Sequence, residues 1–202
     1  MKTITKVLGI LSTVFLFVLF SFKPTEEKRV IVIDAGHGGE DLGAVINGIQ
    51  EKTISETIAK KVKALNKDSN IEVVLLRDGD HFIELKDRVS MINNLNPDLV
   101  ISLHINSSQN KDMNGVRAYV SSSKKEYRDK SMESAEKIVN SVSGNNLAKG
   151  KIEEANFYIL KNANCPAVTL EVGYLSNNND RAYLNSEKGQ NEIASRILES
   201  VK

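Results

Sequence analysis

The chain has 202 residues, of which 41% are hydrophobic and 26% charged, and this length and composition suit one globular domain with a substantial core. Its 27 basic and 26 acidic residues give a formal net charge of +1, so nothing in the charge balance predicts binding to nucleic acid. The single cysteine, Cys165, excludes an intramolecular disulfide and a zinc site built from several cysteines. We expect Cys165 to be a small, buried, apolar side chain.

The start of the chain has the composition of an export segment. Two lysines precede an uncharged run over residues 7–22, and a charged, polar stretch follows. The run is short for a membrane span, which favours a cleaved signal, but no small-x-small cleavage site follows it, which favours an uncleaved anchor through residues 4–22. We therefore expect a signal peptide or membrane anchor at residues 1–25 and an exported domain at residues 26–202, located in the periplasm or cell envelope.

The rest of the sequence alternates between strand-like and helical patterns, which predicts the α/β class. Short apolar runs predict strands at VIVI, IEVVLL, LVISL, GVRAYV, FYIL and AVTLEV. Helical spacing of apolar residues predicts helices at residues 51–65, from residue 85, and around residues 135–142 and 193–201. In the first of these, one stripe contains Ile54, Ile58, Val62 and Leu65. We expect a single domain with about six strands in a mostly parallel or mixed sheet and helices on both faces.

The first predicted strand leads into DAGHGGEDLGA, a glycine-rich loop that carries His37. This loop does not match the dinucleotide pattern G-x-G-x-x-G, because Asp41 occupies the third glycine position. The glycines instead allow the backbone to present the His37 ring tightly at the end of a strand. A histidine hydrogen-bonded within a turn is the alternative. Glu51 opens the next helix, where the helix dipole favours a carboxylate whatever its function.

Two further strands lead into residues that bind metals or protons. LVISL leads into His104. A core histidine whose ring nitrogens are hydrogen-bonded is an equally good interpretation of this residue. Glu171 interrupts the apolar run AVTLEVGYL, and burying an unpaired carboxylate is costly, so a nearby cation or a raised proton affinity is expected. Ligands of open α/β sheets bind beyond the carboxyl ends of the strands. We therefore expect His37, His104 and Glu171 to converge on one crevice. Together with Glu51, they would form a zinc hydrolase site.

Other reactive side chains receive no functional prediction. His81 lies among charged residues in RDGDHF, and we expect it to be a solvated loop side chain. Ser102 and its neighbours near His104 lack the G-x-S-x-G elbow of serine hydrolases. Cys165 precedes a proline and has no adjacent histidine, so a cysteine nucleophile is disfavoured as well.

Six sequence blocks in a fixed order carry a resemblance to a known family: IVIDAGHGGEDLGA, Glu51-Lys52, LLRDGD, DLVISLHINSS, EANFYILKN and PAVTLEVGYLSN. From about Arg29 to its carboxyl terminus, the chain resembles the zinc-dependent N-acetylmuramoyl-L-alanine amidases of bacterial cell-wall metabolism. The resemblance implies Zn²⁺ ligands at His37, Glu51 and His104 and a catalytic glutamate at Glu171. It also implies hydrolysis of the amide bond between N-acetylmuramic acid and L-alanine, with peptidoglycan as the partner.

Two other functions belong to different classes. A zinc peptidase acting on the stem peptide is the enzymatic alternative, because a site of two histidines and one glutamate also serves carboxypeptidases. A non-catalytic wall-binding or regulatory domain is the other, and the loss of any of the four site residues would favour it. Some relatives carry an extra helix that plugs the zinc site. Residues 121–153 have room for about one helix, which the ordinary fold already requires, so self-inhibition by a plugging helix is disfavoured. We expect a monomer, and the sequence leaves open an activating protein.

Overall fold

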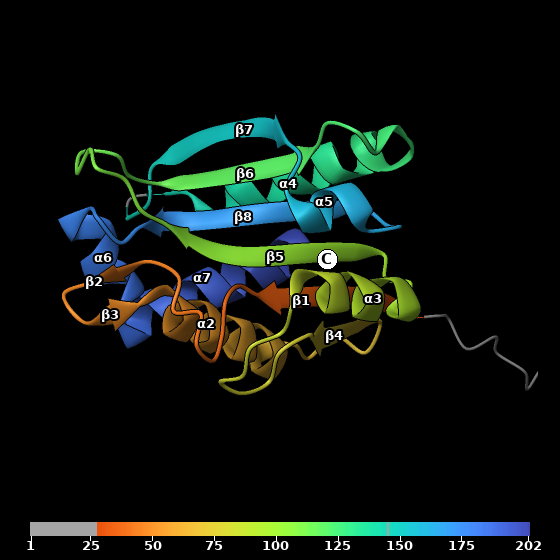
Figure 1. The fold of residues 1–202 in the computed structure, drawn as a ribbon, viewed down its shortest axis with the longest axis horizontal. Coiled ribbons are helices and arrows are strands. Elements are labelled where there is room, and N and C mark those ends of the chain that lie inside the picture. The colour runs from red at the N-terminus through yellow and green to blue at the C-terminus, as the bar shows by residue number, and fades with distance from the viewer. Residues whose placement is uncertain (1–27, 145) are drawn as a thin grey trace, which may run out of the picture.

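The computed structural model describes residues 28–144 and 146–202, so the predicted export segment lies outside the described residues. Within them, a six-stranded sheet has the strand order β4-β1-β5-β8-β6-β7 (Figure 1). Its strands are β1 (Arg29–Ala35), β4 (Ile71–Leu75), β5 (Leu99–Asn106), β6 (Val116–Ser121), β7 (Lys149–Ala155) and β8 (Ala167–Tyr174). Neighbouring strands are parallel except β6 and β8, which pair antiparallel. The sheet is therefore mixed and mostly parallel, as predicted.

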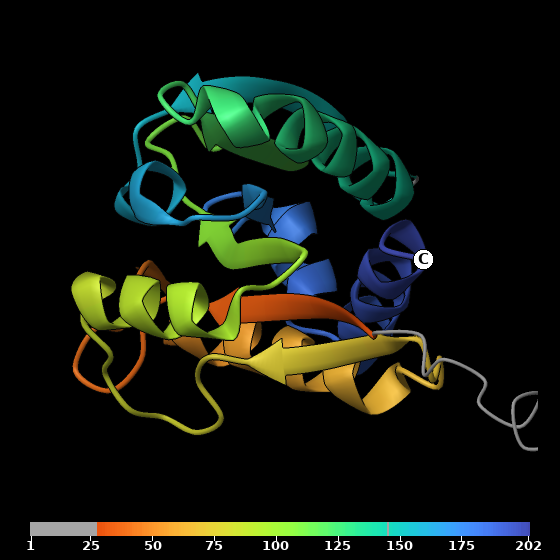
Figure 2. The ribbon, with the colours of Figure 1, turned by 90° about the vertical axis from the view of Figure 1, so that its right-hand side faces the viewer.

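Helices cover both faces of the sheet, and this prediction is also confirmed (Figure 2). The helices are α2 (Glu51–Leu65), α3 (Leu85–Leu95), α4 (Arg128–Val142), α5 (Tyr158–Asn162), α6 (Asn178–Leu184) and α7 (Glu187–Ser200). Helices α2, α4 and α7 bury their apolar stripes in the larger core on one face. Helices α3 and α5 pack over the smaller core on the other. Because both faces are covered, the central strands are apolar along most of their length rather than alternating.

One predicted strand is wrong. The run FYIL starts α5, in which Ile159 and Leu160 are buried while Phe157, just before the helix, and Tyr158 are exposed. A run of four apolar residues does not distinguish a strand from a short helix by periodicity. The sixth strand is instead β7, whose sequence KGKIEEA is mostly charged. It pairs only with β6 at the sheet edge, where charged side chains protect against pairing with another chain.

The four predicted helices are present, with one local difference in α2. Ile54, Ile58 and Val62 are buried against the sheet, whereas Leu65, the last residue of the helix, is 42% exposed. The stripe therefore ends one turn early. Just before α2, the short strands β2 (Val45–Ile46) and β3 (Ile49–Gln50) form an antiparallel hairpin that the sequence analysis did not predict. No helix within residues 28–144 and 146–202 has the length and apolar character needed to cross a membrane.

Candidate metal centre

His37, Glu51 and His104 meet at the carboxyl end of the central strands. His37 follows β1, Glu51 is the first residue of α2, and His104 lies on β5, two residues before the end of that strand. The Glu51 Oε1 atom lies 3.0 Å from His37 Nε2 and 3.0 Å from His104 Nδ1. One donor atom from each residue lies within 4.8 Å of the other two. The loop after β1, the start of α2 and the end of β5 thus present their donor atoms to one point.

The chemistry and spacing of these donors fit a zinc ion. Two imidazole nitrogens and one carboxylate oxygen are ligands that zinc prefers, and catalytic zinc sites use three protein ligands. Bonds of about 2.0–2.1 Å in a tetrahedral site separate neighbouring ligand atoms by about 3.3 Å. The two separations of 3.0 Å are close to this value. The rings of His37 and His104 stand edge to face, with their centres 5.0 Å apart.

Glu51 is held as a charged group in a buried position. Its Oε1 atom accepts a hydrogen bond from the backbone N–H of Ile105, and its Oε2 atom accepts one from the N–H of Ala44. Burial on its own would raise the pKa of Glu51, but the hydrogen bonds from His104, His37 and the Ala44 backbone lower it below the ordinary range. For His37, burial opposes the charged form, but its contacts with Glu51 and Asp41 raise its pKa to about 9. The electrostatic potential between Glu51 and the two histidines therefore favours a positive charge.

A second carboxylate, Asp41, orients His37. The His37 Nδ1 atom lies 2.8 Å from Asp41 Oδ2, and the N–H of Gly43 donates to Asp41 Oδ1 at 3.1 Å. A metal-binding histidine commonly donates its other ring N–H to a carboxylate, which fixes the tautomer and leaves the free nitrogen for the metal. Here that arrangement leaves His37 Nε2 facing Glu51. This role was not predicted from the sequence, although the carboxylate four residues after the histidine was the available signal.

The loop that carries His37 is packed tightly and held by buried cations. His37 has a φ of 61°, in the left-handed region that residues other than glycine rarely adopt. Its carbonyl oxygen accepts a hydrogen bond of 2.6 Å from Arg88, and the Gly36 carbonyl accepts one of 3.2 Å from Arg77. A Cβ atom at Gly36 would collide with the His104 ring. Glycine at this position therefore allows the His104 ring to approach the backbone closely, a contact that was not predicted from the sequence.

The charge of Arg88 is balanced inside the protein. Its guanidinium donates to Asp34 Oδ1 at 2.5 Å and to the Ala35 carbonyl at 2.8 Å. Asp34 is 1% exposed and also accepts a hydrogen bond from the Ser102 hydroxyl. Removing one member of such a buried pair leaves an uncompensated charge, which costs about 3–5 kcal/mol. The polar network beneath His37 is thus built into the fold.

Glu171 lies beside this centre on β8, paired in register with His104 on β5. Its Oε2 atom is buried and has no hydrogen-bond partner among the residues that the structure describes. Burial raises the pKa of Glu171 to about 7, although His104 acts in the opposite direction. A carboxylate with this proton affinity can accept and release a proton near neutral pH. A buried carboxyl group with a raised pKa therefore lies next to the three candidate ligands.

His81 and Cys165 have the environments that were predicted from the sequence. His81 is exposed in the loop before α3. Cys165 is 4% exposed in the smaller core, and burial raises the pKa of its thiol to about 11, which disfavours the nucleophilic thiolate.

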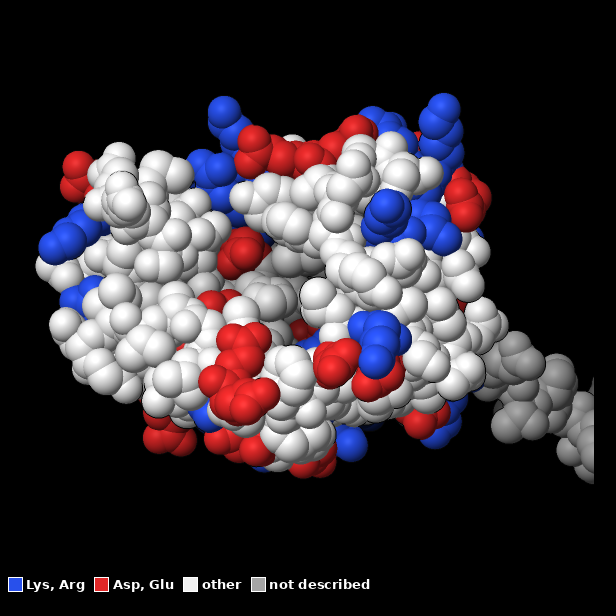
Figure 3. Space-filling model, viewed as in Figure 1, with Lys and Arg blue, Asp and Glu red and all other residues white. Residues whose placement is uncertain are grey.

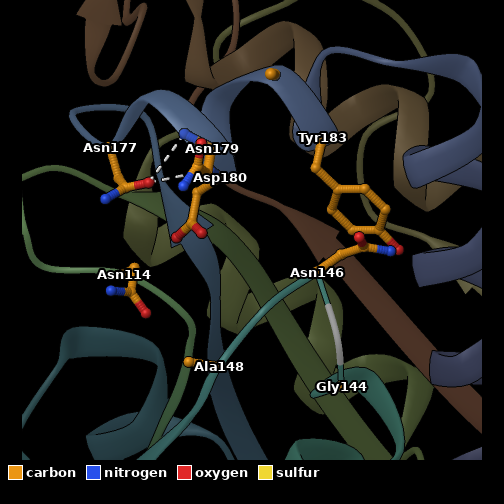
Figure 4. A pocket seen from close by; sticks show the side chains of 9 residues that line it. Asn114, Gly144, Asn146, Ala148, Asn177, Asn179, Asp180 and Tyr183 are labelled. Atoms are coloured by element: carbon orange, nitrogen blue, oxygen red, sulfur yellow. Dashed lines mark hydrogen bonds between the residues drawn. The ribbon is translucent and has the colours of Figure 1, made fainter.

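A larger polar pocket of about 530 Å³ shares no lining residue with the centre (Figure 4). Its walls include Asn114, Asn146 and Asn177, and its buried carboxylate, Asp180, accepts hydrogen bonds from the backbone of Gly115 and Tyr174. The Asn177 side chain caps the start of α6. Asn177 and Asp180 therefore have structural partners of their own.

Comparisons with known proteins agree on one family. A family model described as N-acetylmuramoyl-L-alanine amidase matches residues 31–202. The solved catalytic domain of the amidase CwlV from Bacillus (Paenibacillus) polymyxa var. colistinus is 37% identical, with a TM-score of 0.76 over 86% of this chain and 96% of that one. The amidase AmiC2 of Nostoc punctiforme is 32% identical, with a TM-score of 0.79 over 87% and 96% of the two chains. The Bacillus subtilis protein YqiI is 32% identical over 177 residues, which cover 87% of this chain and 84% of YqiI.

Replacing Asp41 by asparagine tests whether this carboxylate prepares His37 for a metal. The variant keeps the size of the side chain but loses the charge that holds the ring, so we expect zinc affinity to fall about 10- to 100-fold. Competition with a chromophoric chelator measures the affinity. Asp112→Asn, in an exposed loop, is the matched control and should bind zinc like the wild type. Wild-type affinity in Asp41→Asn would show that Asp41 does not orient the ligand.

The raised pKa of Glu171 predicts a pH dependence of stability. Its pKa is about 7 in the folded protein against an ordinary value of 4.5, so between these values the folded state binds more protons than the unfolded state. The free energy of unfolding should therefore fall as the pH rises from about 4.5 to about 7, by at most about 3 kcal/mol. Glu171→Gln should lack this fall. Chemical denaturation in the presence of a chelator measures both proteins, and parallel curves would contradict the raised pKa.

Proposed function

Because this chain belongs to the family of N-acetylmuramoyl-L-alanine amidases, we propose that it is a zinc hydrolase that cleaves the amide bond between N-acetylmuramic acid and L-alanine in peptidoglycan. The observation that carries the proposal is the convergence of His37, Glu51 and His104 beside Glu171. This constellation combines a cation site with a proton-transfer group, which amide hydrolysis requires. The reaction would serve cell-wall remodelling, daughter-cell separation or recycling.

We assign the zinc ligands to His37 Nε2, His104 Nδ1 and the Glu51 carboxylate. The Glu51 Oε1 atom already lies 3.0 Å from each of the two nitrogens. When bound there, zinc would polarise the scissile carbonyl and acidify water, so that hydrolysis proceeds at neutral pH. Asp41 holds the His37 ring for this purpose, and the Arg88 guanidinium holds the backbone of the same residue.

Glu171 is assigned as the general base and then the general acid. Its carboxylate takes one proton from the attacking water, whose oxygen bonds to the lactyl carbonyl carbon of the muramic acid. The carbon–nitrogen bond then breaks, and Glu171 passes the proton to the departing alanine nitrogen. A pKa of about 7 suits both steps, because the group must gain and lose a proton in each turnover. The products are a glycan with a free lactyl carboxylate and a stem peptide with a free amino terminus.

Mass spectrometry of the soluble products of peptidoglycan digestion tests this assignment. Intact stem peptides with a free alanine amino terminus are expected, and a chelator should abolish them. Shortened stems would move the cut to a peptide bond and make the protein a zinc peptidase. Bound zinc without any product would favour a non-catalytic wall-binding or regulatory role.

We also propose that residues 1–25 are a signal peptide or membrane anchor and that residues 26–202 are the catalytic domain, acting as a monomer in the periplasm or cell envelope. Support comes from the apolar run at the start of the chain and from the location of the substrate. An activating protein partner is compatible with this arrangement. The mass of the protein recovered from cell envelopes distinguishes a cleaved from an intact segment, and recovery of the full-length protein from the cytoplasm alone would contradict export.

Substitutions at the four site residues should separate metal binding from proton transfer. Glu171→Gln should retain zinc but lose at least about 100-fold in turnover, because general acid–base catalysis contributes about 10²- to 10⁴-fold. His37→Ala and His104→Ala should instead lower the zinc content. Elemental analysis and a digestion assay measure the two quantities. Near-normal hydrolysis by Glu171→Gln would contradict the role of Glu171, and full zinc content in the alanine variants would contradict their role as ligands.

A further inference from the structure

The segment of residues 77–80, which follows β4, contains none of the candidate metal ligands. Its sequence is RDGD, part of the block LLRDGD, to which the proposed function gives no role. Hydrogen bonds from this segment reach the backbone beside His37 and the backbone beside Glu51. We call residues 77–80 the clamp.

Arg77, the first residue of the clamp, joins these two stretches of backbone directly. Its Nη2 atom donates a hydrogen bond of 3.2 Å to the Gly36 carbonyl oxygen and another of 3.2 Å to the Lys52 carbonyl oxygen. Gly36 immediately precedes His37, and Lys52 immediately follows Glu51. One nitrogen with two N–H groups therefore spans the peptide units next to two candidate ligands.

The guanidinium of Arg77 is itself fixed by other partners. Its Nη1 atom donates to Glu56 Oε2 at 2.6 Å and to the Gly79 carbonyl at 2.9 Å. The Ser55 hydroxyl oxygen lies 3.2 Å and 3.1 Å from the same two carbonyl oxygens that Nη2 contacts. A hydroxyl has only one proton to donate, so Ser55 can bind one of the two carbonyls at a time. Arg77 can hold both at once.

Asp80, at the other end of the clamp, joins the same loop to the same helix. Its Oδ1 atom accepts a hydrogen bond of 2.8 Å from the Gly39 N–H, and its Oδ2 atom accepts one of 2.8 Å from Lys52 Nζ. Lys52 Nζ also donates to the Gly39 carbonyl at 2.7 Å. The loop is thus attached to the start of α2 on both sides of His37, through Gly36 before it and Gly39 after it.

The loop and the segment that follows β4 also pack backbone against backbone. A Cβ atom on Gly38 would collide with the His81 carbonyl oxygen and with the Arg77 side chain. One on Gly39 would collide with the Phe82 nitrogen. No side chain therefore separates the two segments at these points, and a shift of one segment must move the other.

The cations of this network act from inside the fold. Arg77 is 0% exposed and Lys52 is 7% exposed, so both contribute little to the surface. The face of the molecule in Figure 3 is hollowed near its centre, and the charged atoms around the hollow are mostly acidic. Buried groups whose rotamers are fixed by packing and hydrogen bonds are the kind of support that holds metal ligands in place.

His104 is held in a different way from the other two candidate ligands. It lies within β5, whose pairing with β1 and β8 fixes its position through the sheet. His37 lies in a loop and Glu51 begins a helix, so the sheet alone does not set the separation between them. We propose that Arg77 and Asp80 are positioning residues, which set this separation before the metal binds. The role rests on the proposed function.

Zinc affinity of the full-length apoprotein tests this role in two variants. Arg77→Lys keeps the positive charge beside Glu56, but a single ammonium nitrogen does not reproduce the fork of the guanidinium. Asp80→Ala removes a side chain that is 56% exposed, so the variant should fold. In each we expect zinc affinity to fall about 10- to 100-fold, as for other groups that orient metal ligands. Competition with a chromophoric chelator measures the affinity.

Two control variants separate positioning from a general loss of stability. Asp78→Ala is matched to Asp80→Ala, because Asp78 lies in the same segment, is 65% exposed and contacts Lys60 at 3.5 Å. Ile138→Ala leaves a cavity in the larger core at α4, which lowers stability without touching the clamp. Both controls should bind zinc like the wild type.

Cobalt(II) bound in place of zinc gives a second measurement, because its visible absorption depends on the geometry of its ligands. The spectra of Arg77→Lys and Asp80→Ala should differ from that of the wild type, whereas the spectra of the two controls should match it.

Wild-type zinc affinity with an unchanged cobalt spectrum in both variants would overturn the positioning role and leave the proposed function intact. An equal loss of affinity in Ile138→Ala would also overturn it, since a general loss of stability would then explain the result. A wild type that binds no zinc would overturn the proposed zinc site, and the positioning role with it.

Discussion

The site depends on one buried carboxylate, that of Glu51. It contacts His37 after β1, His104 and the Ile105 backbone on β5, and the Ala44 backbone in the loop before α2, so it joins segments from three parts of the chain. Without a cation or protonated imidazoles between them, this charge would be buried at a large cost. The position of Glu51 at the start of α2 adds the favourable dipole of the helix. Fold and chemistry therefore impose the same requirement, that positive charge be held at this point.

The surrounding network makes the site rigid before any ligand binds. The left-handed backbone of His37 is held by Arg88, and the charge of Arg88 is in turn balanced by Asp34. Lys52 binds the Gly39 carbonyl further along the same loop. Groups fixed in this way lose little entropy when a metal or substrate binds. Glu171 differs from them, because its buried Oε2 atom has no hydrogen-bond partner among the described residues.

The sequence predicted the parts of this site that show a local pattern. His104 extends an apolar strand, Glu171 interrupts one, and His37 follows one, so each was visible against its neighbours. Asp34 and Arg88 were not found, because their roles depend on a contact between residues 54 positions apart, which no local pattern reveals. The mistaken strand at FYIL and the missed strand β7 have a similar origin. The burial of a short apolar run, or the pairing of a charged edge strand, is decided by the rest of the sheet.

Anomalous diffraction at the zinc edge from crystals of the active protein would test the central claim most directly. The account predicts one strong peak within bonding distance of His37, Glu51 and His104, with Glu171 close by but not bonded to it. A peak held by other residues in a protein that cleaves peptidoglycan, or full activity in crystals that show no peak, would contradict it.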